Sequence, residues 1–196
     1  MEYFKINSNN GKFIKGPLII KPKIFLDNRG YFFESWNHLE FNKIISREIN
    51  FVQDNQSESK FGVLRGLHYQ LEPKAQAKLV RCTKGAIFDV LADIRRHSDT
   101  YGEWSGIVLN ERNKLQLWIP EGFVHGFISL KDSSEVQYKT NEYWDKDYER
   151  SLLWNDSDLN INWPLVNTNN KCKIITNHKD SIAPTLKDIE KSGELF

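Results

Sequence analysis

The stretch that decides the fold is Ile119-Pro120-Glu121-Gly122-Phe123-Val124-His125-Gly126-Phe127. Its Pro-x-Gly segment is typical of a turn, and the residues after the turn form a strand-like run that carries His125. Short runs of the same kind recur on both sides, separated by turn signals. Many short strands at this spacing predict an antiparallel sandwich or barrel rather than a parallel sheet. The predicted strands are Leu18–Ile20, Lys23–Phe25, Tyr31–Glu34, Phe51–Gln53, Gly62–Gln70, Lys78–Thr83, Ala86–Ile94, Trp104–Leu109, Leu115–Ile119, Val124–Leu130 and Glu135–Glu142.

Helical spacing is confined to short segments. Apolar residues between His38 and Glu48 recur at intervals typical of a helix. After about Tyr143 the sequence is rich in Asp, Asn, Trp and Pro, which predicts an ordered arm of loops that ends in a short helix near Thr185–Lys191. Because no linker, repeat or low-complexity segment divides the chain, we expect one domain over residues 1–196.

The charge of the chain argues against broad classes of partner. With 27 basic and 26 acidic residues the net charge is +1, so no overall field selects nucleic acid or an anionic membrane. No apolar run has the length of a membrane span, and the first residues lack the apolar region of a signal peptide. Cys82 and Cys172 fit no metal or redox spacing, so we expect reduced thiols in a cytoplasmic protein.

A second strand-like stretch, Gly62–Gln70, is interrupted by an arginine, a glycine and a histidine. A strand that served only a core would not favour Arg65 or His68, because buried cations and imidazoles need partners. Strict alternation would put these two side chains on opposite faces of a sheet. Either Gly66 marks a bulge that brings both to one pocket, or Arg65 reaches around the mouth of the barrel.

The Pro-x-Gly-x-x-His pattern at Pro120–His125 resembles the second motif of the cupin superfamily, whose members are small jelly-roll barrels. In metal-binding cupins the first motif supplies His-x-His and a glutamate. The matching strand here offers only His68, which Tyr69 and Gln70 follow. Because a zinc or iron site needs three or four protein ligands, we expect no metal.

Longer motifs resemble the dTDP-4-dehydrorhamnose 3,5-epimerase family, in order and over nearly the whole chain. They are Asp27–Glu34, Phe51–Asn55, Val63–Gln70, Lys78–Cys82, Phe88–Val90, Asp93–Arg95, Leu117–Phe127 and Leu153–Asp156. The resemblance implies an all-β fold of the cupin type, a double-stranded β-helix or jelly roll with one or two short helices, and a homodimer. It also implies that a dTDP-linked nucleotide sugar, dTDP-4-dehydro-6-deoxy-D-glucose, is epimerised at C3 and C5 to dTDP-4-dehydro-L-rhamnose without a cofactor.

The resemblance assigns catalytic roles to four residues. Both reacting carbons flank the C4 ketone, so the chemistry needs a base on one face, an acid on the other and a cation near the ketone oxygen. His68 matches the base, and Asp180 matches the carboxylate that orients it, as in the histidine–aspartate half of a serine triad. Tyr138 matches the proton donor and Lys78 matches the cation. Outside the family context, each would be interpreted as an ordinary core, packing or surface residue.

Further matches imply a substrate-binding set. Its members are Arg29, Glu34, Gln53, Asn55, Arg65, His125, Glu149 and Lys179. Tyr143 and Trp144 are additional candidates for aromatic platforms under a sugar or a base. The sequence leaves open a 3-epimerase or 3,5-epimerase acting on another nucleotide-linked 4-ketosugar, a metal-dependent cupin, and a non-catalytic sugar-binding module.

Overall fold

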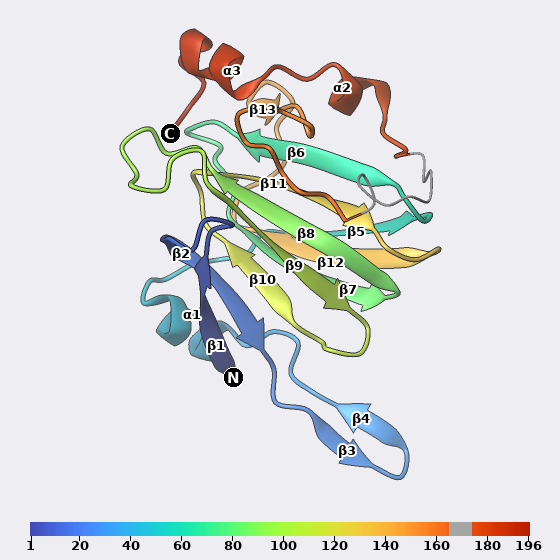
Figure 1. Ribbon diagram of the computed structural model, residues 1–196. Coiled ribbons are helices and arrows are strands. Elements are labelled where there is room, and N and C mark those ends of the chain that lie inside the picture. Colours follow the sequence, from blue (N-terminus) through green and yellow to red (C-terminus); the bar gives the residue numbers. More distant parts are fainter. Residues whose placement is uncertain (165–173) are drawn as a thin grey trace.

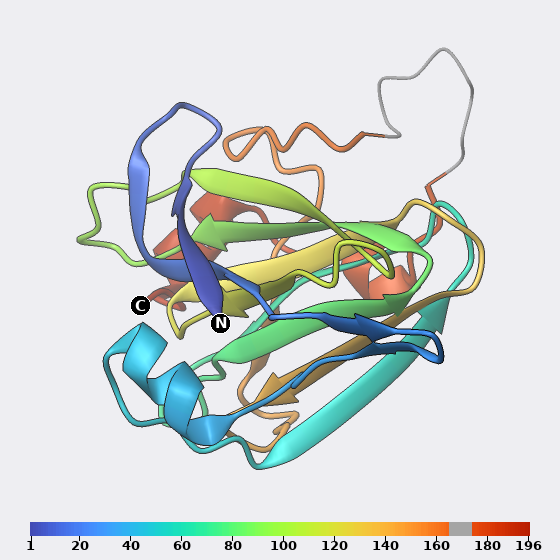
Figure 2. The same ribbon diagram turned by 90° about the horizontal axis from the view of Figure 1, so that it is seen from below.

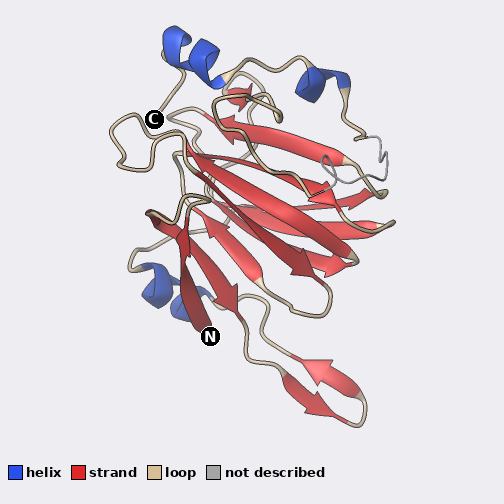
Figure 3. Ribbon diagram, viewed as in Figure 1, coloured by secondary structure: helices blue, strands red, loops and turns tan. Residues whose placement is uncertain are grey.

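The computed structural model describes residues 1–164 and 174–196 and consists mainly of two facing antiparallel sheets (Figures 1 and 3). The all-β prediction is confirmed. One sheet has the strand order β1-β2-β10-β7-β12-β5, with β5 along its edge (Figure 2). Its strands are β1 (Glu2–Asn7), β2 (Phe13–Lys21), β10 (Gln116–Ile119), β7 (Lys78–Lys84), β12 (Ser134–Thr140) and β5 (Gln53–Ser59).

The second sheet has the strand order β13-β6-β11-β8-β9. Its strands are β13 (Glu149–Ser151), β6 (Leu64–Gln70), β11 (Phe123–Ser129), β8 (Ala86–Asp93) and β9 (Trp104–Asn110). A separate hairpin of β3 (Phe25–Asp27) and β4 (Gly30–Phe32) projects from the body of the molecule, and every residue in its two strands is exposed (Figure 1). The helices are α1 (His38–Ile45), α2 (His178–Ser181) and α3 (Leu186–Ser192).

An apolar core fills part of the space between the sheets. Alternation along each strand sends every second side chain inward, as Val80 and Cys82 of β7 and Val136 of β12 show. Ile87 and Leu91 of β8 meet them from the other sheet. Cys82 is thus packed as a small apolar residue, as expected. The same alternation determines which polar residues of these strands face the interior.

The C-terminal arm covers the outer face of the five-stranded sheet. Leu64 and Leu67 of β6 pack there with Trp163 and with Leu186 and Ile189 of α3. All five side chains are buried. The arm therefore forms a second core, and α2 and α3 lie on this side of the molecule (Figure 1).

Helix α1 packs on the outer face of the six-stranded sheet. Its buried Phe41 meets Trp118 of β10 edge to face, with the ring centroids 5.2 Å apart. The helix ends at Ile45 rather than at the predicted Glu48. Ser46 ends it, because this residue takes the left-handed conformation with φ 55°.

Strand β6 carries one extra residue relative to β11. His68 pairs with His125 and Arg65 pairs with Phe127, so three steps along β6 match two steps along β11. Gly66 lies at this irregularity with φ 122°, a conformation that L side chains rarely adopt. Both β6 leucines consequently face the arm, whereas Arg65 and His68 share the opposite face. The predicted bulge at Gly66 is confirmed, and a pocket shared by Arg65 and His68 stays a prediction.

Several elements differ from the sequence prediction. β1, β13 and α2 were not predicted, and β5 spans Gln53–Ser59 instead of Phe51–Gln53. The described residues form three helices where one or two were expected, and the additional helix is the four-residue α2. Within the described ranges, no helix is long and apolar enough to cross a membrane. Cys172, expected to be a reduced thiol, lies outside the described residues.

Candidate active site

Two polar side chains of the six-stranded sheet face the interior beside the apolar core. Lys78 lies two residues before Val80 on β7, and Tyr138 lies two residues after Val136 on β12. Because Val80 and Val136 belong to the core between the sheets, the period of two points Lys78 and Tyr138 inward as well.

The five-stranded sheet supplies three polar side chains to the same interior. His125 lies between Phe123 and Phe127 of β11, which are core residues. Asp89 lies between two core aliphatic residues of β8. The bulge in β6 adds His68 to this face. Groups that can carry charge are therefore gathered between the sheets, beside the apolar core.

His68 and Asp180 form a hydrogen-bonded pair. Oδ1 of Asp180 lies 2.7 Å from Nε2 of His68, and Oδ2 accepts a 3.1 Å hydrogen bond from the backbone N–H of Gly66. Burial raises the pKa of Asp180, but the hydrogen bond and charge of His68 outweigh it, so the net shift of the pKa is downward. Since Asp180 occupies Nε2 and no described residue hydrogen-bonds Nδ1, Nδ1 is the ring nitrogen left for chemistry.

Lys78 places a buried ammonium group beside this pair. Its Nζ donates a 3.4 Å hydrogen bond to the backbone carbonyl of His68. Burial lowers the pKa of Lys78 to about 8, and the negative charges of Asp89 and Glu149 oppose this shift. The side chain is therefore mostly protonated at pH 7 and loses its charge as the pH passes 8.

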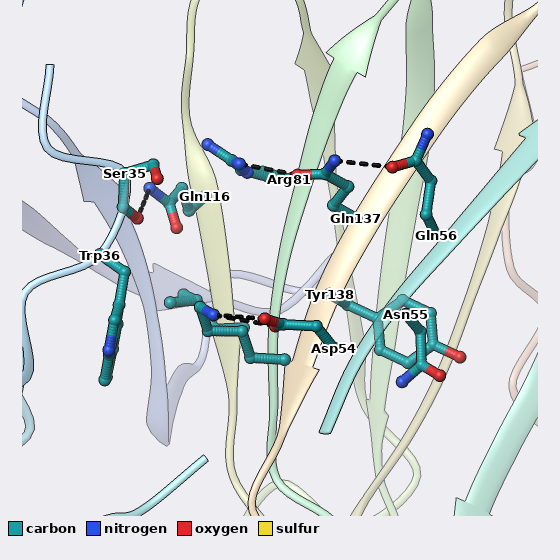
Figure 4. Close-up of a pocket in the computed structure, with 11 residues that line it drawn as sticks. Ser35, Trp36, Asp54, Asn55, Gln56, Arg81, Gln116, Gln137 and Tyr138 are labelled. Carbon is teal, nitrogen blue, oxygen red and sulfur yellow. Dashed lines mark hydrogen bonds and ion pairs between the residues drawn. The ribbon is translucent and has the colours of Figure 1, made fainter. Parts of the chain in front are cut away.

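Tyr138 is a protonated phenol at neutral pH. Burial raises the pKa of its hydroxyl, Glu149 adds to the shift, and Arg65 opposes it. In the strand register Tyr138 lies opposite Asn55, and the two side chains lie together in Figure 4. The described structure thus holds an acid on one sheet and an imidazole on the other.

A polar rim joins β13, α2 and β5. Lys179 donates a 2.6 Å hydrogen bond to Glu149, and although burial raises the pKa of Glu149, this contact makes the net shift downward. Gln53 donates to Oδ1 of Asn55 at 2.9 Å and accepts a 3.1 Å hydrogen bond from the backbone N–H of Trp144. Nδ2 of Asn55 is buried and has no partner among the described residues.

Arg65 connects β6 to β5, the edge strand of the other sheet. Its Nε donates a 3.1 Å hydrogen bond to Oγ of Ser59, and its Nη2 donates one of 2.9 Å to the backbone carbonyl of Glu58. Both acceptors are on β5. The guanidinium therefore lies at the opening between β5 and β6, where it remains exposed.

The structure does not bring Arg29 and Glu34 to this interior group. Arg29 follows β3 at the tip of the hairpin, where its side chain is 86% exposed and pairs with Asp27 at 2.6 Å. Glu34 accepts a 3.3 Å hydrogen bond from Asn37. The hairpin projects at the opposite end of the molecule from α2 (Figure 1). Within one chain, Arg29 is therefore separated from the residues around α2.

A cavity of about 370 Å³ lies on the outer face of the six-stranded sheet (Figure 4). Arg81 donates a 2.7 Å hydrogen bond to Gln137, which donates one of 2.8 Å to Gln56. Arg81 and Gln137 alternate with the inward-facing residues of β7 and β12, so the sheet separates this cavity from His68. Tyr138 and Asn55 also line this cavity, whereas His68, Lys78 and Asp180 do not.

Asp89 is a member of the interior group to which the sequence reasoning gave no role. Its Oδ1 lies 2.5 Å from Nε2 of His125, and its side chain is fully buried. The available signal was an acidic residue inside the apolar run Ala86–Ala92, since a buried carboxylate needs a partner. Within the described ranges, no three His, Cys, Asp or Glu side chains are grouped so that they could hold a metal ion.

Comparisons with known proteins agree with the fold and the motifs. The family model for dTDP-4-dehydrorhamnose 3,5-epimerase matches residues 12–188. The enzyme of that name from Shigella flexneri is 56% identical over 150 residues, which cover 76% of this chain and 83% of the relative.

Solved structures resemble the whole chain. The dTDP-4-dehydrorhamnose 3,5-epimerase of Elizabethkingia anophelis NUHP1 is 41% identical with a TM-score of 0.87, and the match covers 96% of this chain and 97% of that one. The 3,5-epimerase of Legionella pneumophila Philadelphia 1 in complex with dTDP-4-keto-L-rhamnose is 39% identical with a TM-score of 0.88, covering 99% and 97%. The chain belongs to the dTDP-4-dehydrorhamnose 3,5-epimerase family, and its relatives in that family are isomerases.

Proposed function

We propose that this chain epimerises dTDP-4-dehydro-6-deoxy-D-glucose at C3 and C5 and so forms dTDP-4-dehydro-L-rhamnose. The observation that carries the proposal is the pair of His68 and Asp180 with Lys78 beside it and Tyr138 on the facing sheet. Membership of the family supports the same reaction. A sugar-binding module would need neither a base nor an opposing acid in one interior.

The proposed chemistry proceeds through an enolate. Nδ1 of His68 takes the proton from the carbon next to the ketone, the electron pair of the broken C–H bond forms the C=C bond of the enolate, and the π pair of the ketone moves to the C4 oxygen. Asp180 stabilises the imidazolium that results. The ammonium group of Lys78 stabilises the charge on the oxygen.

Inversion requires the new proton to arrive from the opposite face. Tyr138 donates its phenolic proton to the carbon, the C=C electron pair of the enolate forms the new C–H bond, and the pair on the oxygen re-forms the ketone. Solvent then removes the proton from His68 and returns one to Tyr138. The same cycle at the second carbon completes the double epimerisation, and no electrons are gained or lost.

The binding of the nucleotide is assigned to the rim. Arg65 and Lys179 are cations suited to a diphosphate, and Trp144 offers an exposed ring to a base. The Legionella pneumophila relative is bound to a dTDP-linked sugar, which supports the same nucleotide here. His125, Gln53, Asn55 and Glu149 complete the proposed contacts.

We also infer a homodimer in which the hairpin of one copy completes the site of the other. Arg29 lies at the tip of the hairpin, which projects away from α2, yet the resemblance assigns Arg29 and Glu34 to substrate binding. Leu26 and Phe32 of the hairpin are 80% and 67% exposed, an arrangement that suits burial against a second copy. The cytoplasmic location expected from the cysteines stays a prediction.

Solvent exchange tests the proposed reaction. The protein is incubated with dTDP-4-dehydro-6-deoxy-D-glucose in deuterium oxide, and the sugar is analysed by NMR. We expect deuterium at C3 and at C5, because each inversion replaces a carbon-bound proton with one from solvent. Deuterium at C3 alone would support the 3-epimerase alternative instead.

The nucleotide is tested by the same exchange on a UDP-linked 4-keto-6-deoxy sugar. We expect faster deuterium exchange on the dTDP-linked sugar. Faster exchange on the UDP-linked sugar would support the alternative of an epimerase for another nucleotide. If neither sugar exchanged at either carbon, the proposed function would be wrong.

A further inference from the structure

Asp89 is a fully buried carboxylate of the interior group, and one of its oxygens has no hydrogen-bond partner among the described residues. It lies on β8 between Ile87 and Leu91, both fully buried core residues, and its own side chain has no exposed surface. Desolvating an ionised carboxylate costs free energy unless hydrogen bonds or opposite charges compensate. A buried carboxylate does not stabilise the apolar core of a strand. The contacts of Asp89 should therefore show its role.

One oxygen of Asp89 is bonded and the other is not. Oδ1 is paired with Nε2 of His125 at 2.5 Å. Oδ2 is buried and has no hydrogen-bond partner among the described residues. Because Nε2 of the ring is occupied, Nδ1 of His125 is the nitrogen that remains free to contact a substrate. The carboxylate thereby fixes the orientation of a ring that belongs to the proposed binding set.

The ammonium group of Lys78 makes fewer hydrogen bonds than it can donate. Its ammonium group can donate three hydrogen bonds, but the described residues give it one, the 3.4 Å contact with the carbonyl of His68. Asp89 is the stronger of the two acidic side chains whose charge favours the protonated form of Lys78. An unpaired carboxylate oxygen and an underused ammonium group thus occupy the same interior.

We propose that Asp89 is a positioning residue of the epimerisation site, a role that rests on the function proposed above. It holds His125 through Nε2, and it supplies the negative charge beside which Lys78 remains an ammonium ion. Lys78 can then stabilise the enolate oxygen, whereas a neutral amine would do so poorly. Asp89 itself need not touch the substrate.

The direction of the pH effect follows from the charges around Lys78. Among the described residues, the other charged or titratable side chains of this interior and its rim are Arg65, His68, Cys82, His125, Tyr138, Glu149 and Asp180. Among the acids named, only Glu149 would continue to favour protonated Lys78 if Asp89 lost its charge. The pKa of Lys78, already lowered to about 8 by burial, would then fall further.

The substitution Asp89→Asn removes the charge and keeps the shape. We expect the high-pH limb of the kcat/KM profile to move down by about one pH unit or more, so that the loss of activity is larger at pH 8 than at pH 6. The Cε resonance of 13C-labelled Lys78, followed by NMR without substrate, should titrate at correspondingly lower pH. An unchanged limb and an unchanged Lys78 titration would overturn the proposal.

Asp93→Asn is the matched control. Asp93 is equally buried on β8, but its carboxylate accepts hydrogen bonds from Arg95, Ser98 and Thr100, away from the interior group. We expect this variant to lose stability while keeping the pH limb of the parent protein. A similar shift in both variants would mean that any lost carboxylate on β8 has the same effect, which contradicts a specific role for Asp89.

A measurement on the unaltered protein covers the case in which Asp89→Asn does not fold. The 15N resonances of His125 should show a proton on Nε2 between pH 6 and 8. A ring with the proton on Nδ1 alone would exclude the proposed bond to Asp89. The Lys78 and His125 resonances do not depend on turnover. They therefore test the positioning role of Asp89 even if the exchange experiment rejects the proposed function.

Discussion

The tautomer of His68 is fixed by a residue from a distant part of the chain. Asp180 accepts from Nε2, so the neutral ring carries its proton there and presents the lone pair of Nδ1. The carboxylate is itself held by the backbone N–H of Gly66. Its lowered pKa keeps it ionised at neutral pH, where it can stabilise the imidazolium formed after proton transfer.

His68→Ala tests the assignment of the base. We expect deuterium exchange at C3 and C5 to fall by roughly 10²- to 10⁴-fold, because the variant has no group to accept the carbon-bound proton. The dissociation constant of dTDP, measured by calorimetry, should change little, since the nucleotide contacts are assigned to the rim. His97→Ala, which alters an exposed loop histidine, is the control and should keep full exchange. Undiminished exchange in His68→Ala would identify another base.

Individual residues could be predicted from the sequence where a motif carried them. The sequence marked His68, Lys78, Tyr138 and Asp180, and the structure gathers the first three in one interior and joins the fourth to His68. Asp89 could not be assigned a role, because its partner is His125 of the neighbouring strand β11, and the sequence of β8 alone does not show that contact. The register between two strands is a property of the fold, and the sequence of one strand does not determine it.

At the scale of the element, β6 depends on a close approach to β11. A Cβ atom on Gly66 would lie 2.6 Å from Cα of Gly126 and 2.8 Å from the carbonyl oxygen of His125. Only glycine allows this contact together with φ 122°. The bulge that places Arg65 and His68 on one face therefore requires a residue without a side chain.

Gly66→Ala tests this requirement. We expect the free energy of unfolding to fall by about 2 kcal/mol or more, because backbone atoms of β11 would have to move. Exchange activity should fall more than stability implies, since the bulge orients His68. Gly11→Ala is the control: Gly11 also has a positive φ, 83°, but a Cβ there meets no atom within 4 Å. That variant should lose roughly 1 kcal/mol and keep its activity. Equal effects of the two substitutions would contradict the role given to the bulge.

Strands with an apolar face were predicted well, and polar strands were not. β8 and β11 are buried along nearly their whole length, and both were predicted from the sequence. β5 consists of Gln, Asp, Asn, Ser and Glu, residues that are depleted in strands or neutral. It forms because β12 pairs with it along seven residues, and its inward side chains line the polar site rather than the core. Tertiary pairing thus overrides local propensity at the edge where the site opens.

At the scale of the whole molecule, the hairpin and the interior group are parts of one proposed site held by different copies. A two-fold dimer would place each hairpin against the partner by the same contact twice. The position of Arg29 then becomes meaningful, because an exposed cation at the tip of a projecting arm can contact a diphosphate bound elsewhere.

Mixing two inactive variants tests this arrangement. His68→Ala and Arg29→Ala chains are purified separately, unfolded, mixed in equal amounts and refolded together. If the arms cross, a mixed dimer has one site with both residues intact, so exchange should recover to about a quarter of the parent value. If both residues act within one chain, mixing should restore nothing. Light scattering on the parent protein should give the mass of two chains, and a monomer would reject the dimer outright.

His68 and Asp180 are separated by 112 positions along the chain, and Asp180 arrives on the short helix α2 near the C-terminus. A contact between such distant positions must wait for the intervening chain to be made and folded. During synthesis, the sandwich and its histidine can exist before the carboxylate has emerged from the ribosome. Docking of α2 therefore completes the proposed base, so activity requires that synthesis has passed Asp180 and that this segment has reached β6.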